Sequence, residues 1–138
     1  MIGFNVSTII AVLAVIFLIA ITLGAGYLRF RPRKLKTEYF QKRWKEAQRL
    51  CVETETWPLA IINADKLLDE ALKRLHYRGK SMGERLTAAQ HELTDNDAVW
   101  FSHKLRNKLV HEQIKVNKRQ VKKALMGFGR ALKDLGAI

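Results

Sequence analysis

The sequence predicts an all-α protein, in which one N-terminal transmembrane helix is followed by an antiparallel bundle of about five helices. Residues 6–28 form an apolar stretch, and the first 28 residues carry no charged side chain. From Thr37 onward, apolar residues recur at the three- and four-residue spacing of helices, and no run alternates convincingly with period two. The only prolines are Pro32 and Pro58, where helices are expected to be interrupted or to begin.

The apolar stretch is long enough to cross a bilayer. At about 1.5 Å per residue, Val6–Leu28 reaches roughly 34 Å, and a hydrocarbon core is about 30 Å thick. A basic linker, 29–36, follows and is expected to bind anionic lipid headgroups; its cations are Arg29, Arg31, Arg33, Lys34 and Lys36. A cleaved signal peptide would need a charged segment before the apolar core, and none is present. The positive-inside rule then predicts a single-pass protein of the cell membrane, with its N-terminus outside and residues 37–138 in the cytoplasm.

The rest of the chain forms one strongly basic helical domain. The net charge of the protein is +12, and all of it lies after residue 28, which favours an anionic neighbour such as lipid or nucleic acid. We expect helices at about 37–55, 57–76, 82–93 and 97–112, and a last helix after Asn117. Thr56, Ser81 (with Glu84 in a capping box) and Asn117 are the expected caps. The predicted core stripes are Phe40, Trp44, Ala47 and Cys51; Ile61, Leu68, Leu72 and Leu75; Met82, Leu86 and Ala89; Ala98, Phe101, Leu105 and Leu109; and Val121, Leu125, Phe128, Leu132 and Leu135.

Two smaller patterns carry expectations of their own. Asp65 and Asp69 lie four residues apart on one helix face, with Lys66 and Lys73 nearby. Such a pair can act in acid–base chemistry, but a solvated ion-pair face is the expected arrangement. Cys51 is the only cysteine, so it cannot form an internal disulfide or a zinc cluster, and it is interpreted as a small core residue. No metal or cofactor is expected.

The helix at 97–112 carries the candidate chemistry. At 100° per residue, His103 and His111 fall away from the predicted core face, and they are too far apart, at about 12 Å along the axis, to bind one metal. Arg106 can bind a phosphate with two hydrogen bonds, and His111 can transfer a proton near neutral pH. Together they suffice for metal-free RNA cleavage, but they lie about 140° apart on the helix. A dimer would bring both pairs into one cleft.

The segment Arg106-Asn107-Lys108-Leu109-Val110-His111 resembles the R-N-x-x-x-H signature of the HEPN superfamily of small helical domains. The resemblance covers about 37–135 and implies an HEPN-like bundle. Many members are metal-independent RNases that act as dimers, often in toxin or defence systems, and others are non-catalytic modules. Carried over, Arg106 and His111 are the catalytic pair and Asn107 orients them. RNase members often place a tyrosine two residues after the histidine, where this chain has Gln113.

Three functions remain open at this point: a membrane-anchored endoribonuclease, a non-catalytic HEPN-like dimerisation or binding module, and a small membrane scaffold. The expected partners are membrane lipid, a second copy of the chain, RNA, and a neutralising or regulatory protein that would restrain an RNase. The residues expected to bind nucleic acid or another anionic surface are Lys104, Lys108, Lys118, Arg119, Lys122 and Lys123.

Overall fold

The structure, a computed structural model, describes residues 5–29 and 34–138, with the side chains of all of these except 26–29. In these ranges all regular structure is helical, with six α-helices, one short 3-10 helix and no strand. The chain divides into two compact units, Met1–Arg33 and Lys34–Ile138. The prediction of an all-α protein is therefore confirmed.

The first unit contains one helix, α1 (Val6–Arg29), which matches the predicted apolar span. Its segment Val6–Ala25 has a mean hydropathy of 2.9 and no buried residue, so it is long and apolar enough to cross a membrane. The hydroxyl of Thr22 lies 2.9 Å from the carbonyl oxygen of Ile19 and bonds back onto the helix.

The basic linker is only partly described. Arg31 and Arg33 lie outside the described residues, as does the side chain of Arg29. Lys34 and Lys36 are exposed. Their predicted role at lipid headgroups stays a prediction.

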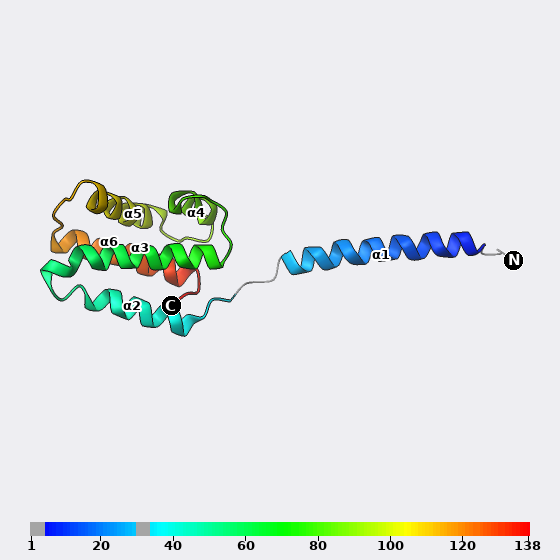
Figure 1. Ribbon diagram of the computed structural model, residues 1–138, viewed down its shortest axis with the longest axis horizontal. Coiled ribbons are helices and arrows are strands. Elements are labelled where there is room, and N and C mark those ends of the chain that lie inside the picture. The colour runs from blue at the N-terminus through cyan, green and yellow to red at the C-terminus, as the bar shows by residue number, and fades with distance from the viewer. Residues whose placement is uncertain (1–4, 30–33) are drawn as a thin grey trace. The chain divides into compact units, whose positions relative to one another are not determined.

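The second unit is a bundle of five α-helices: α2 (Thr37–Arg49), α3 (Trp57–Arg74), α4 (Met82–Ala89), α5 (Asn96–His111) and α6 (Lys118–Asp134). A 3-10 turn, Thr54–Thr56, precedes α3. Helix α3 is central, because it contacts each of the other four, while α5 and α6 pack along one another. Consecutive long helices run in opposite directions (Figure 1).

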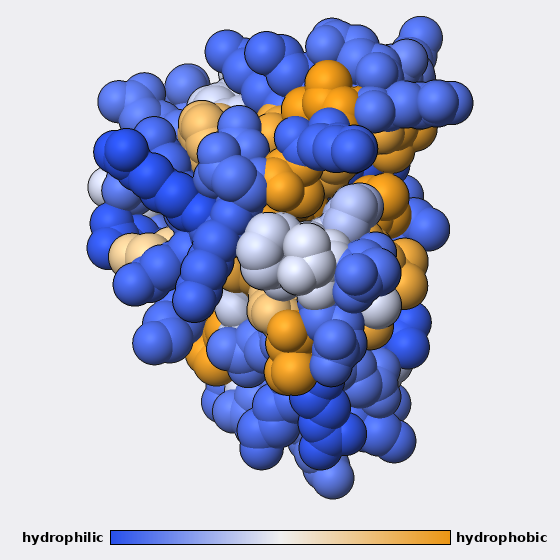
Figure 2. Space-filling view, turned by 90° about the vertical axis from the view of Figure 1, so that its left-hand side faces the viewer, coloured by the Kyte–Doolittle hydropathy of each residue, from blue (hydrophilic) through white to orange (hydrophobic). Residues whose placement is uncertain are grey.

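The core of the bundle is formed by the predicted stripes. Most predicted core residues are buried, and Trp44, Cys51, Leu75, Ala98 and Phe101 are half-buried. All buried core residues lie between Phe40 and Ala137, and no residue of the apolar α1 segment is buried. The bundle therefore has a complete core of its own. Seen from the end where α2 leads into α3 and α5 into α6, its surface is largely hydrophilic, with apolar patches between the charged residues (Figure 2).

The first bundle helix is shorter than predicted, since α2 ends at Arg49 rather than near residue 55. The carbonyl groups of the two residues after it accept hydrogen bonds from side chains further along the chain. The Thr56 hydroxyl donates to the carbonyl oxygen of Leu50 at 2.6 Å, and the Trp57 indole donates to that of Cys51 at 3.0 Å. Thr56 thus closes the turn after α2 and does not cap α3, contrary to our expectation.

The other predicted caps are present. Asn117 and Gln120 form a complete capping box at the start of α6. At α4, the Ser81 hydroxyl accepts a hydrogen bond from the backbone N–H of Glu84. The Glu84 carboxylate accepts from the backbone N–H of Lys80 rather than from that of Ser81. Helix α4 ends at Ala89, four residues earlier than predicted, and the Asn96 amide bonds to the carbonyl oxygen of Gln90 just after it.

Gly127 lets α5 and α6 approach closely. A Cβ atom placed there would lie 2.3 Å from Ser102 Oγ and 2.5 Å from the carbonyl oxygen of Ala98. The buried Ser102 hydroxyl lies 2.8 Å from the Ala98 carbonyl oxygen and 2.9 Å from that of Ala124, so it bridges the two helices. Helices α5 and α6 therefore pack closely at Gly127, and α5 is held against α6 there.

The substitution Gly127→Ala should lower the free energy of unfolding by about 1–3 kcal/mol, because the added methyl group collides with backbone atoms of α5. Urea unfolding of Lys34–Ile138, followed by circular dichroism, measures the change. Gly83→Ala is the matched control, since its Cβ would meet nothing closer than 3.5 Å, and helix propensity favours alanine there by up to about 1 kcal/mol. Equal stability of Gly127→Ala and the parent would contradict the packing described.

Candidate functional site

A buried carboxylate lies at the contact between α3 and α5. Asp65 of α3 is 2% exposed, and its Oδ1 lies 2.8 Å from Nδ1 of His103 on α5, which is 8% exposed. A carboxylate only accepts hydrogen bonds, so Nδ1 carries the proton of this bond. In the neutral imidazole, Nε2 is then left as an acceptor.

Asn107 and Arg106 complete the arrangement. The side-chain nitrogen of Asn107, Nδ2, lies 3.3 Å from His103 Nε2 and donates to it. The side-chain oxygen of Asn107, Oδ1, accepts from Arg106 Nη1 at 2.9 Å. Arg106 Nε lies 3.2 Å from Asp65 Oδ2. This last contact is an ion pair and not a directed hydrogen bond, because the buried N–H has no acceptor in line with it.

These contacts form a closed ring of four side chains, which we call the α3/α5 ring: Asp65, His103, Asn107 and Arg106. Three of its contacts are hydrogen bonds and the fourth is the Arg106–Asp65 ion pair, and together they fix the imidazole tautomer and the amide orientation. The single negative charge of the buried carboxylate is balanced by the arginine. The ring therefore fixes the guanidinium of Arg106, whose side chain remains 26% exposed.

The ring opens onto a cavity of about 490 Å³ between α3, α4 and α5, lined by all four ring residues. The other charged side chains along it are Lys66, Asp69, Lys80 and Arg85. Four cations therefore face two carboxylates. One carboxylate, Asp69, is already bound by Arg85 Nε at 2.7 Å and by Lys73 Nζ at 2.7 Å. The volume suits a small ligand, and the charge balance favours an anion.

The structure corrects two expectations about this region. Asp65 does not belong to a solvated ion-pair face, because α5 covers it. Its position carried a signal: Ile61, Asp65, Leu68 and Leu72 follow one helical stripe, so the aspartate falls within the core face of α3. His103 was placed on the outward face of its helix and is instead buried, because α5 packs on α3 as well as on α6.

The predicted catalytic residues lie in different surroundings. Arg106 and Asn107 are half-buried and belong to the ring, whereas His111 is exposed and is the last residue of α5. Two residues later Gln113 adopts the left-handed conformation, with φ +49°, and stops the helix. Within the described residues, no hydrogen bond or ion pair joins His111 to Arg106.

The cations predicted to bind an anionic surface are all exposed, but they do not share one face. Lys104 and Lys108 lie on α5. Lys118 and Lys122 line a groove between α2 and α6, and Arg119, Lys122 and Lys123 line a cleft between α5 and α6. Lys123 Nζ lies 4.1 Å from the centre of the Phe101 ring, a cation–π distance.

Comparison with protein-family models, with curated proteins and with solved structures gave no match. The geometry of the described residues therefore carries the functional argument by itself.

Nucleophilic chemistry at the single thiol is disfavoured. Burial raises the pKa of the Cys51 thiol, so less of the reactive thiolate is present at neutral pH. Its sulfur faces the carbonyl oxygen of Ala47, at 3.9 Å. Cys51 lines the groove between α2 and α6, which agrees only in part with its predicted place in the core.

Replacing Asp65 with alanine should lower the free energy of unfolding by about 3 kcal/mol, because the ring loses its charge balance and leaves polar groups of His103 and Arg106 unpaired. Urea unfolding of Lys34–Ile138 measures the loss. Asp97→Ala is the control for removing a carboxylate, since Asp97 is exposed in the first turn of α5 and should cost no more than about 1 kcal/mol. Similar losses in the two variants would show that the ring contributes little.

Alkylation of Cys51 by iodoacetamide should be slower in the folded protein than in 8 M urea, because the raised thiol pKa lowers the thiolate fraction at pH 7. The folded-state rate should rise with pH and continue rising past the value at which a free cysteine levels off. Mass spectrometry of timed samples gives both rates. A folded protein that reacts as fast as the unfolded chain would contradict the burial of this thiol.

Proposed function

We propose that the chain is a membrane-anchored RNA-binding domain, resembling the HEPN superfamily, that cleaves RNA without a metal as a homodimer. Helix α1 serves as the anchor, and the bundle faces the cytoplasm. The single observation that carries the proposal is the α3/α5 ring, which holds Arg106 and Asn107 in fixed orientation at the wall of a cation-lined cavity. A planar guanidinium with part of its surface free is suited to a phosphate group.

The exposed side of α5 supports the choice of RNA as ligand. Lys104, Lys108 and His111 are exposed on this helix, and Lys66 and Lys80 stand along the adjoining cavity. Phosphate contacts by such cations provide most of the affinity for nucleic acid and make it depend on salt. Arg106 would then bind the scissile phosphate, at the wall of the cavity.

Cleavage needs the second protomer, because Arg106 and His111 of one chain are not in contact. Val110, which is next to His111, is 46% exposed. Its apolar side chain could pack against the α5 helix of a second copy of the chain. In such a dimer one His111 takes the proton of the ribose 2′-hydroxyl, which attacks phosphorus. His111 of the second copy protonates the departing 5′-oxygen, leaving a 2′,3′-cyclic phosphate and a 5′-hydroxyl. Arg106 stabilises the charge that develops on the phosphate oxygens.

A specific observation favours a second candidate, a non-catalytic binding module. Arg106 and Asn107 bond to each other and to their own chain's Asp65 and His103, so their side chains already have a structural role. In this case the cavity and the α5 cations bind RNA or a nucleotide, and His111 is a surface residue.

Incubation of the full chain, in detergent micelles, with fluorescent RNA in EDTA should give metal-independent cleavage. His111→Ala and Arg106→Lys should each slow cleavage by at least about 100-fold. The first variant removes the proton transfer, and the second removes bidentate binding of the phosphate. RNA binding by His111→Ala, measured by fluorescence anisotropy, should remain near that of the parent. His91→Ala is the matched control, because His91 is also exposed and lies outside the site.

The outcomes separate the two candidates. If cleavage is absent while a Lys104→Glu, Lys108→Glu variant loses RNA binding, the binding module holds and the nuclease is wrong. If cleavage occurs equally in the parent and in His111→Ala, the activity does not come from the proposed site. If neither His111→Ala nor the Lys104→Glu, Lys108→Glu variant changes RNA cleavage or RNA binding, both candidates fail.

A further inference from the structure

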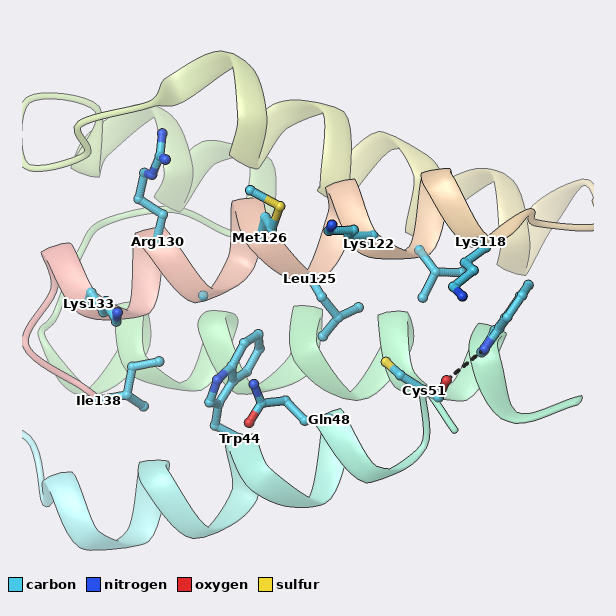
Figure 3. A pocket seen from close by; sticks show the side chains of 13 residues that line it. Trp44, Gln48, Cys51, Lys118, Lys122, Leu125, Met126, Arg130, Lys133 and Ile138 are labelled. Carbon is cyan, nitrogen blue, oxygen red and sulfur yellow. Dashed lines mark hydrogen bonds between the residues drawn. The ribbon is translucent and has the colours of Figure 1, made fainter. Parts of the chain in front are cut away.

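We propose that the groove between α2 and α6 binds an acyl chain of an anionic membrane lipid. Both helices pack on α3, and α2 reaches α6 through the Trp44 side chain, which lies against Gly129. A cavity of about 640 Å³ runs between them (Figure 3). The proposal rests on α1 as membrane anchor and is independent of RNA binding.

The floor and walls of the groove are mainly apolar, with Gln48 as the uncharged polar side chain among the residues that line it. Trp44 rises from α2 toward α6, and Leu125 points back from α6 toward α2 (Figure 3). Met126 is 58% exposed and also lines the groove. The indole nitrogen of Trp57 bonds to the carbonyl oxygen of Cys51, so its polar atom is satisfied. The part of this surface that stays open to water, Met126 with the half-buried Trp44 and Trp57, favours a hydrophobic ligand.

The rim of the groove is cationic. Lys118, Lys122, Arg130 and Lys133 follow one side of α6 along it, and no acidic side chain lines it. Arg130 pairs with Asp95 at 2.8 Å, whereas the three lysines make no ion pair within the described residues. An apolar interior with lysines at its edge matches an amphiphile that has a hydrocarbon chain and a negative head.

The closeness of the groove to α1 along the chain favours a lipid over the other possible occupants of the groove. The seven residues 30–36 between α1 and α2 can span at most about 25 Å, so a membrane containing α1 keeps lipid within reach. A second copy would bring the same three lysines against this basic rim, which like-charge repulsion disfavours. A helix of a partner protein is about 10–12 Å across with its side chains, which is too wide for a cavity of small-molecule size.

The test uses the full chain in nanodiscs that contain phosphatidylglycerol or phosphatidylcholine with brominated acyl chains, because bromine quenches tryptophan fluorescence at contact. A Trp100→Phe variant leaves Trp44 and Trp57, the groove tryptophans. Its fluorescence should fall with the brominated anionic lipid and much less with the zwitterionic one. A Trp44→Phe, Trp57→Phe variant leaves only Trp100, which lies beside His103 and not in the groove, and should stay unquenched.

Charge variants test the rim. Lys118→Gln with Lys122→Gln should weaken the apparent affinity for phosphatidylglycerol, read from the quenching curve, by roughly 30-fold, as the loss of two surface lysines predicts. Lys42→Gln with Lys45→Gln removes the same charge from exposed positions of α2 outside the groove and should change it little. Bound lipid should also slow labelling of Cys51 by a maleimide.

Three results would overturn the proposal. Quenching of Trp100 as strong as that of the groove tryptophans would mean that the lipid contact is non-specific. Absence of quenching together with a Cys51–Cys51 cross-link would place a second copy in the groove. Protection of Cys51 by an acidic amphipathic peptide, but not by phosphatidylglycerol, would place a protein partner there. A chain that fails to enter nanodiscs at all would instead refute the anchor.

Discussion

The buried carboxylate of Asp65 is the group on which the arrangement of α3 and α5 depends. A charge removed from water is costly unless it is paired and fully hydrogen-bonded. Asp65 is paired with Arg106 and bonded to His103, and Asn107 joins these two residues to each other. Rotation or sliding of α5 would break several of these contacts at once. The polar ring thus fixes the register of the two helices, a requirement that apolar packing alone would meet less strictly.

The same constraint links the fold to its candidate chemistry. The other side of α5 is held against α6 through Gly127 and Ser102, so the helix is fixed on two sides and only its remaining surface faces solvent. That surface carries Lys104, Lys108 and His111, whereas Arg106 remains partly open at the wall of the cavity. A helix held in this way can present phosphate-binding groups without reorganisation, which lowers the entropic cost of binding a ligand.

The helices, most of the core and two of the three caps could be predicted from the sequence, because stripes such as Val121, Leu125 and Phe128 depend only on local periodicity. The ends of α2 and α4 could not, since they depend on side chains six residues on that bond to the carbonyl groups just after each helix. The site was found only in part. Arg106 and Asn107 stood out as a motif, but Asp65 and His103 are joined across 38 positions in the sequence. A helical wheel treats each helix alone and does not show that α5 is covered on two sides.

The short connection between α1 and α2 has a consequence for association. If α1 lies in a bilayer, each bundle diffuses in two dimensions, and the start of α2 is held within about 25 Å of the end of α1. Two copies then meet at an effective concentration set by their density in the membrane rather than by the volume of the cell. Contacts as limited as one exposed Val110 per chain could then suffice for pairing, and the dimer population would follow expression level and membrane area. Release of the bundle by proteolysis after α1 would dissociate such a pair without altering any residue of the interface.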